Sequence, residues 1–119
     1  MLFLETLVVL RLCVHLSIYI SVEKIYQKTI AEPVSFEGIG LHSGKKSKIR
    51  IIPGSKDSGI VFKRIDLNNN NLIEANYKSV SSTTLSTTLQ NKYGVKVSTV
   101  EHLLAALYIA NIESAVIEI

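Results

Sequence analysis

Two reactive side chains, Glu101 and His102, stand next to each other in the stretch KVSTVEHLLAAL, residues 96–107. The apolar residues that follow recur at helical spacing and predict a helix over about residues 99–110, with both side chains in its first turn. A carboxylate can act as a general base and an imidazole can bind a metal ion. The pair could therefore form part of a metal-dependent hydrolytic site.

A structural role competes for Glu101. The spacing Ser98-x-x-Glu101 matches a capping box, in which the serine hydroxyl accepts the Glu101 amide and the carboxylate reaches back to the helix start. We therefore predict that the helix begins at Ser98. The sequence alone leaves open whether Glu101 is catalytic or only a cap.

The direction of His102 is more informative. Its helix has one apolar stripe that must face the core, formed by Val100, Leu103, Leu104, Leu107 and Ala110. At about 100° per residue, His102 lies nearly opposite that stripe. We expect it to be exposed or to face a second body.

The metal ligands that such a site needs are incomplete. A catalytic zinc ion is held by about three protein ligands, and the metalloprotease pattern H-E-x-x-H would require a histidine where Ala106 stands. The only other histidines, His15 and His42, do not have metal-ligand spacing, and the single cysteine, Cys13, excludes a cysteine-rich site.

A glycine-rich stretch, GIGLHSGKK at residues 38–46, superficially suggests a phosphate-binding loop. The pattern G-x-x-x-x-G-K-[ST] would need glycine at position 39 and Ser or Thr at position 46, which are Ile39 and Lys46. A strand pattern follows where a helix is required. We expect a sharp turn with His42 exposed in it.

The charge distribution argues against a nucleic-acid partner. The net charge is only +3, and the clustered basic residues Lys45, Lys46, Lys48 and Arg50 fall on an alternating strand pattern. No aromatic residues are interleaved with them, as a nucleic-acid groove would require. We predict a solvated strand face.

The remaining pattern indicates an α+β fold. The chain has 119 residues, 47% of them hydrophobic and 19% charged, enough for one domain with a modest core. Short alternating segments predict an antiparallel sheet layered with at least one helix, with strands near residues 27–38, 47–53, 60–65, 72–77, 83–89, 95–98 and 114–119.

Residues 1–25 form an apolar N-terminal extension that differs from the domain over residues 26–119. Residues 2–22 have the length of a membrane span, but Glu5, Arg11 and His15 interrupt them. An arginine near the centre of a span costs about 2.5–3.5 kcal/mol. A non-native extension, a loosely membrane-associated helix and a true span all remain open.

Four stretches together resemble one enzyme family: FEGIGLHSGKK, KSVSSTTLSTTL, VKVSTVEHLLAAL and NIESAVIEI, in this order between residues 36 and 119. They are similar to the N-terminal part of the UDP-3-O-acyl-N-acetylglucosamine deacetylases, zinc enzymes of lipid A biosynthesis. The resemblance implies two similar α+β domains with the site between them. It also implies removal of acetate from a UDP-linked, acylated N-acetylglucosamine.

The resemblance assigns roles to individual residues. It implies that Glu101 is the general base and that His102 is one zinc ligand. Leu85 and Ser86 match a segment that lines the site, and His42 is a weaker substrate-side candidate. The other zinc ligands, a His and an Asp on an H-x-x-x-D helix, and a further His acting as general acid belong to the family's second domain and have no counterpart here.

We therefore expect a truncated N-terminal portion of a deacetylase, missing its C-terminal domain and inactive alone. It would lie in the cytoplasm, beside the inner membrane, with weak membrane association through residues 2–22. The alternative is a non-catalytic, membrane-associated fragment or interaction module in which Glu101 is only a cap.

Overall fold

The computed structural model describes residues 26–40 and 43–119. The apolar extension over residues 1–25 and His42 lie outside the described residues, so the expectations for them stay predictions. Among the residues that are described, no helix is long and apolar enough to cross a membrane.

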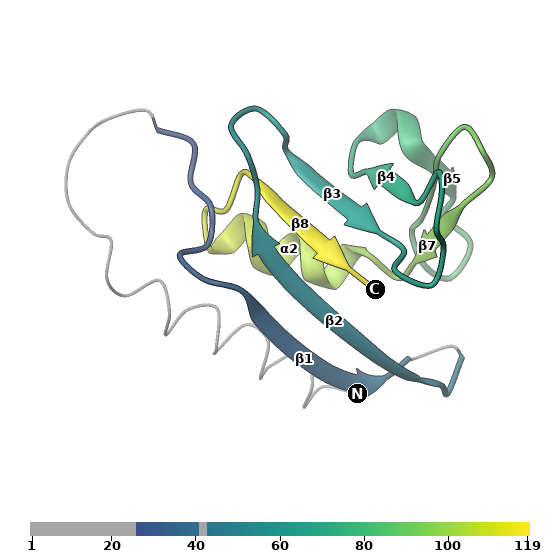
Figure 1. The fold of residues 1–119 in the computed structure, drawn as a ribbon. Coiled ribbons are helices and arrows are strands. Elements are labelled where there is room, and N and C mark those ends of the chain that lie inside the picture. Colours follow the sequence, from purple (N-terminus) through teal and green to yellow (C-terminus); the bar gives the residue numbers. More distant parts are fainter. Residues whose placement is uncertain (1–25, 41–42) are drawn as a thin grey trace.

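The larger of two sheets has five strands in the order β1-β2-β8-β3-β4 (Figure 1). Their bounds are β1 Val34–Ile39, β2 Lys46–Pro53, β8 Ala115–Glu118, β3 Ile60–Lys63 and β4 Leu72–Glu74. Neighbouring strands are antiparallel except β3 and β8, which are parallel. The last strand of the sequence is thus inserted between β2 and β3.

Alternation along these strands separates a buried face from a solvated one. Ile51, Ile117, Phe62 and Ile73 stand opposite one another across four strands, and each is at most 1% exposed. Burying one such side chain stabilises the fold by about 1.5–3 kcal/mol. This row is the centre of the core.

Helix α2, Glu101–Ile109, packs on the buried face of the larger sheet (Figure 1). Val100 and Leu107 are 2% and 1% exposed, and Leu103, Leu104 and Ala110 are half-buried against the same core. The apolar stripe predicted from the sequence is therefore the packed side of the helix.

The smaller sheet is antiparallel, with strand order β5-β6-β7, and it follows a 3₁₀ turn, η1, Tyr77–Ser79. Its strands are β5 Val80–Ser82, β6 Thr88–Gln90 and β7 Lys96–Ser98. Leu89 and Val97 face each other and contribute to the common core. The α+β class is confirmed, whereas the division into two sheets was not foreseen.

Side-chain hydrogen bonds to backbone carbonyls connect the two sheets. Arg64 Nη1 donates to the Lys96 carbonyl at 2.9 Å. Asn91 Nδ2 donates to the carbonyls of Asn70 and Leu72 at 2.7 and 2.9 Å. The small sheet is thereby held at the β4 edge of the large one.

Candidate active site

The helix that carries Glu101 and His102 begins later than predicted. It starts at Glu101, its N-cap is Val100, and no side chain caps it. Ser98 belongs to β7, and its hydroxyl lies 2.9 Å from the Thr88 hydroxyl on the paired strand. The predicted capping box and a helix start at Ser98 are therefore wrong.

A sharp reversal at Thr99 explains this difference. Thr99 has φ of +60°, a left-handed conformation that threonine rarely adopts. It separates the end of β7 from the helix, so Ser98 stays in the strand ladder and cannot reach the first helical amides. Glu101 and His102 nevertheless occupy the first turn of α2, as expected.

The Glu101 carboxylate contacts a residue outside its helix. Its Oε2 accepts the backbone N–H of Thr87 at 3.1 Å, and this contact is partly buried. The Thr87 carbonyl in turn accepts the Thr99 N–H at 2.9 Å. Both the N–H and the carbonyl of Thr87 are thus hydrogen-bonded to residues 99–101, where the helix begins. The sequence analysis did not identify this role of Thr87.

His102 is exposed, as its position opposite the apolar stripe predicted. His102 is next to Glu101 in the chain, whereas Leu107, on the predicted stripe, is only 1% exposed. The first turn of α2 therefore offers a braced carboxylate and a solvent-facing imidazole side by side.

The loop before Thr87 contains the two predicted lining residues. Leu85 has φ of +63° and is 88% exposed, while Ser86 is half-buried. Because Thr87 is bonded to Glu101, this β5–β6 loop borders the start of α2. Leu85 and Ser86 precede Thr87 by two residues and one residue, and their predicted role in lining a site stays a prediction. His42 lies outside the described residues.

These residues do not complete a metal site. Within residues 26–40 and 43–119, no group of three or more His, Cys, Asp or Glu side chains could hold a metal ion. One imidazole and one neighbouring carboxylate fall short of the three ligands that fix a catalytic zinc.

The described residues of the glycine-rich stretch, on either side of positions 41 and 42, connect the antiparallel strands β1 and β2. Gly40 N–H donates to the Lys45 carbonyl, Gly44 N–H donates to the Gly40 carbonyl, and Gly44 has φ of +64°. Strand β2 follows it. No strand-to-helix phosphate loop is therefore formed.

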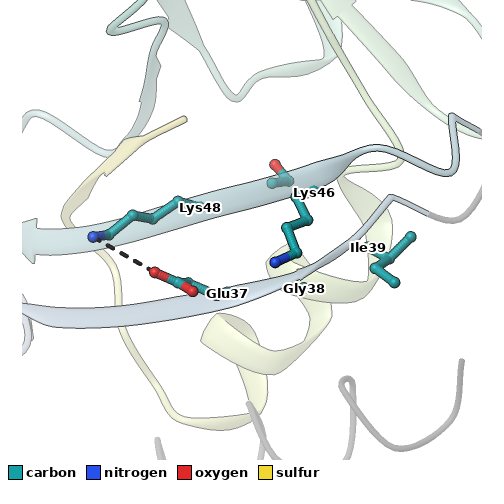
Figure 2. A pocket seen from close by; sticks show the side chains of 6 residues that line it. Glu37, Gly38, Ile39, Lys46 and Lys48 are labelled. Carbon is teal, nitrogen blue, oxygen red and sulfur yellow. Dashed lines mark ion pairs between the residues drawn. The ribbon is translucent and has the colours of Figure 1, made fainter.

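An open pocket lies on the β1–β2 hairpin beside this turn, and Figure 2 shows its side chains. Lys48 and Glu37 point toward each other there, with Nζ and Oε1 3.7 Å apart. Both side chains are exposed, so their pairing contributes little. The predicted solvated face is confirmed, and Glu101 and His102 do not line this pocket.

The fold and the site define an α+β domain that presents a carboxylate–imidazole pair of the kind found in hydrolytic enzymes. The family model described as LpxC, UDP-3-O-acyl N-acetylglycosamine deacetylase, matches residues 27–119. The chain belongs to this family.

Individual relatives agree with that assignment. The chain is 45% identical over 95 residues to the UDP-3-O-acyl-N-acetylglucosamine deacetylase of Shewanella denitrificans, covering 80% of this chain and 31% of the relative. It is 46% identical over 95 residues to the enzyme of the same name from Saccharophagus degradans, with the same coverage. For the Geotalea uraniireducens enzyme the identity is 47% over 94 residues, covering 79% of this chain and 30% of the relative. The chain thus spans about a third of the length of these curated relatives.

Proposed function

We propose that this chain supplies the Glu–His part of a zinc-dependent deacetylase site that acts on a UDP-linked, 3-O-acylated N-acetylglucosamine. The observation that carries the proposal is the first turn of α2, where Glu101 is braced by Thr87 and His102 faces solvent. The names of the relatives support the substrate class.

In this proposal Glu101 accepts a proton from the water that attacks the acetamide carbonyl, and His102 is one zinc ligand. A bound zinc ion would polarise that carbonyl and stabilise the negative charge developing on its oxygen. Leu85 and Ser86 would line the substrate from the β5–β6 loop, and His42 stays a weaker candidate on the substrate side.

The remaining zinc ligands and the acid that protonates the leaving amine must come from elsewhere. We propose that they lie in a second domain, corresponding to the part of the relatives that this chain does not cover. The described residues would then be inactive alone. The proposal places the protein in the cytoplasm beside the inner membrane, with residues 2–22 associating weakly with its surface.

Two substitutions separate the proposed roles. The 119-residue chain is combined with a polypeptide carrying the uncovered part of the Shewanella denitrificans relative, and bound zinc and released acetate are measured. His102→Ala should lose zinc and activity together, because it removes a ligand. Glu101→Ala should retain zinc and lose the rate of acetate release, since general-base catalysis contributes about 10²–10⁴-fold.

A non-catalytic interaction module is the second candidate. The Thr87–Glu101 hydrogen bond favours it, because that bond alone gives the carboxylate a structural purpose. Under this alternative, Glu101→Ala would lower stability but leave acetate release by the combined polypeptides unchanged. That result would reject catalysis by Glu101.

A further inference from the structure

We infer that the backbone N–H of Thr87 is a positioning group that fixes Glu101 through one carboxylate oxygen and leaves the other to exchange the proton. This inference rests on the proposed function, because it concerns the same carboxylate. It adds a residue from the loop between β5 and β6 to the site and assigns different tasks to the two oxygens.

The contact joins two separate elements. Thr87 precedes β6, whereas Glu101 opens α2, and the bond between them, at 3.1 Å, spans 14 positions of sequence. The Thr87 carbonyl is held from the other side by the Thr99 N–H at 2.9 Å. The Thr87 main chain is therefore held at its carbonyl as well as at its amide, directly before β6 begins.

Glutamate has three rotatable side-chain bonds, so an unanchored carboxylate at the start of a helix samples many orientations. Here Oε2 is bonded to Thr87, and no second hydrogen bond to the carboxylate occurs within residues 26–40 and 43–119. Oε1 is the oxygen left for a water molecule. Holding a catalytic base in one orientation raises the rate because less freedom is lost in the transition state.

The Thr87 side chain is not required for this task, since the donor is the main-chain amide. Substituting the Thr87 side chain would therefore leave the N–H donor in place and would not test the inference. Replacing the amide by an ester, by incorporating the α-hydroxy analogue of threonine at position 87, removes the N–H and keeps the side chain. Val95 gives a matched control: its N–H donates to Asn91 Oδ1, also at 3.1 Å and partly buried, at the far end of the same β6–β7 hairpin.

The first experiment examines the bond itself in the 119-residue chain by amide hydrogen exchange. We expect Glu101→Ala to accelerate exchange at Thr87 relative to Val95 by roughly tenfold, the size of one hydrogen bond to a charged group. Glu101→Gln retains an acceptor oxygen and should preserve the protection. Equal acceleration of Thr87 and Val95 in Glu101→Ala would show only general destabilisation and would overturn the inference.

The second experiment measures kcat and KM in the combined two-polypeptide enzyme, normalised to bound zinc. The ester at position 87 should lower kcat roughly 10- to 100-fold with KM and zinc content retained, as expected for a misplaced base. The ester at position 95 should weaken folding to a similar degree but keep kcat.

The outcomes distinguish this inference from the proposed function. If Glu101→Ala lowers kcat but the ester at position 87 does not, the positioning role is rejected and the catalytic role stands. If neither change affects kcat, the proposed function fails as well. If the esters at positions 87 and 95 lower kcat equally, the role of Thr87 is purely structural and the positioning role is rejected.

Discussion

The two sheets differ in what holds them. The five-stranded sheet has a continuous row of fully buried side chains, including Ile51 and Phe62, at 0% and 1% exposed. In the three-stranded sheet only Leu89 and Val97 are buried, and every residue of β5 is exposed. The large sheet therefore rests on apolar burial, whereas the small one depends on hydrogen bonds to its neighbours.

The residues proposed for chemistry lie where the small sheet meets the helix. Thr87 borders β6 and bonds to Glu101 at the start of α2. A rigid core and a more weakly held border divide the tasks of stability and function between two regions. From this division we predict that substitutions lower the free energy of unfolding most in the core and progressively less towards the border.

The largest effect should follow from removing the centre of the core. Phe62→Ala should lower the free energy of unfolding by about 3–5 kcal/mol, because it leaves a cavity between β8 and β4. Leu85→Ala, at a leucine 88% exposed in the site loop, should change it by less than about 0.5 kcal/mol. Urea unfolding measures both. Comparable losses would mean that the site loop is part of the core.

An intermediate effect should follow from separating the sheets. Asn91→Ala removes two donated bonds, to the carbonyls of Asn70 and Leu72, and two accepted bonds, from the amides of Tyr93 and Val95. We expect a loss of about 1–3 kcal/mol. Amide exchange should also rise more in β6 and β7 than in β2 and β8.

The matched control for this change is Asn68→Ala, an exposed asparagine in the nearby loop. It should leave stability within about 0.5 kcal/mol of the unaltered chain. Uniform acceleration of exchange across both sheets in Asn91→Ala would argue against two separately held regions.

The smallest effect on stability should come from lowering the pH, which acts on the ion pair between Arg64 and Asp66. The Arg64 guanidinium donates to both Asp66 carboxylate oxygens, and this hydrogen bonding holds the pKa of Asp66 below its ordinary value. A pKa lowered by folding stabilises the protein above the unfolded-state pKa of aspartate, and that contribution is lost as pH falls through the folded-state pKa. Because the pair is solvent-exposed, the contribution is small.

Urea midpoints of the unaltered chain and of Asp66→Asn should therefore differ near neutral pH and converge in acid. A difference that widens as the pH falls would contradict the direction of the Asp66 shift. Because Arg64 also donates to the Lys96 carbonyl, loss of the pair should loosen β7 first.

Much of the larger sheet could be predicted from the sequence. Strands β2 and β8 alternate with period two because one face is buried, and β2, β3 and β8 were each predicted within a few residues. Their pairing could not be predicted, since β8 lies parallel to β3 through contacts between distant segments. Strand β5 and the turn η1 were missed because neither contains a buried residue.

The candidate site was likewise predictable within one element, whereas its contact with a distant segment was not. The helical stripe placed Glu101 and His102 in a first turn and turned His102 outward, as observed. The partner of Glu101 was not predictable, because it depends on a left-handed conformation at Thr99 that the residue type does not favour. The capping pattern was present in the sequence, but Ser98 belongs to β7 and its hydroxyl contacts Thr88 on the paired strand.

The most direct test of the account is acetate release from the acetylated UDP-sugar by the purified 119-residue chain, alone and with the remaining two thirds of a relative supplied in trans. We predict no zinc-dependent release from the chain alone, since His102 is the one zinc ligand proposed in it and a catalytic zinc ion is held by about three. We also predict measurable release from the combination. Robust zinc-dependent deacetylation by the chain without any partner would contradict the account.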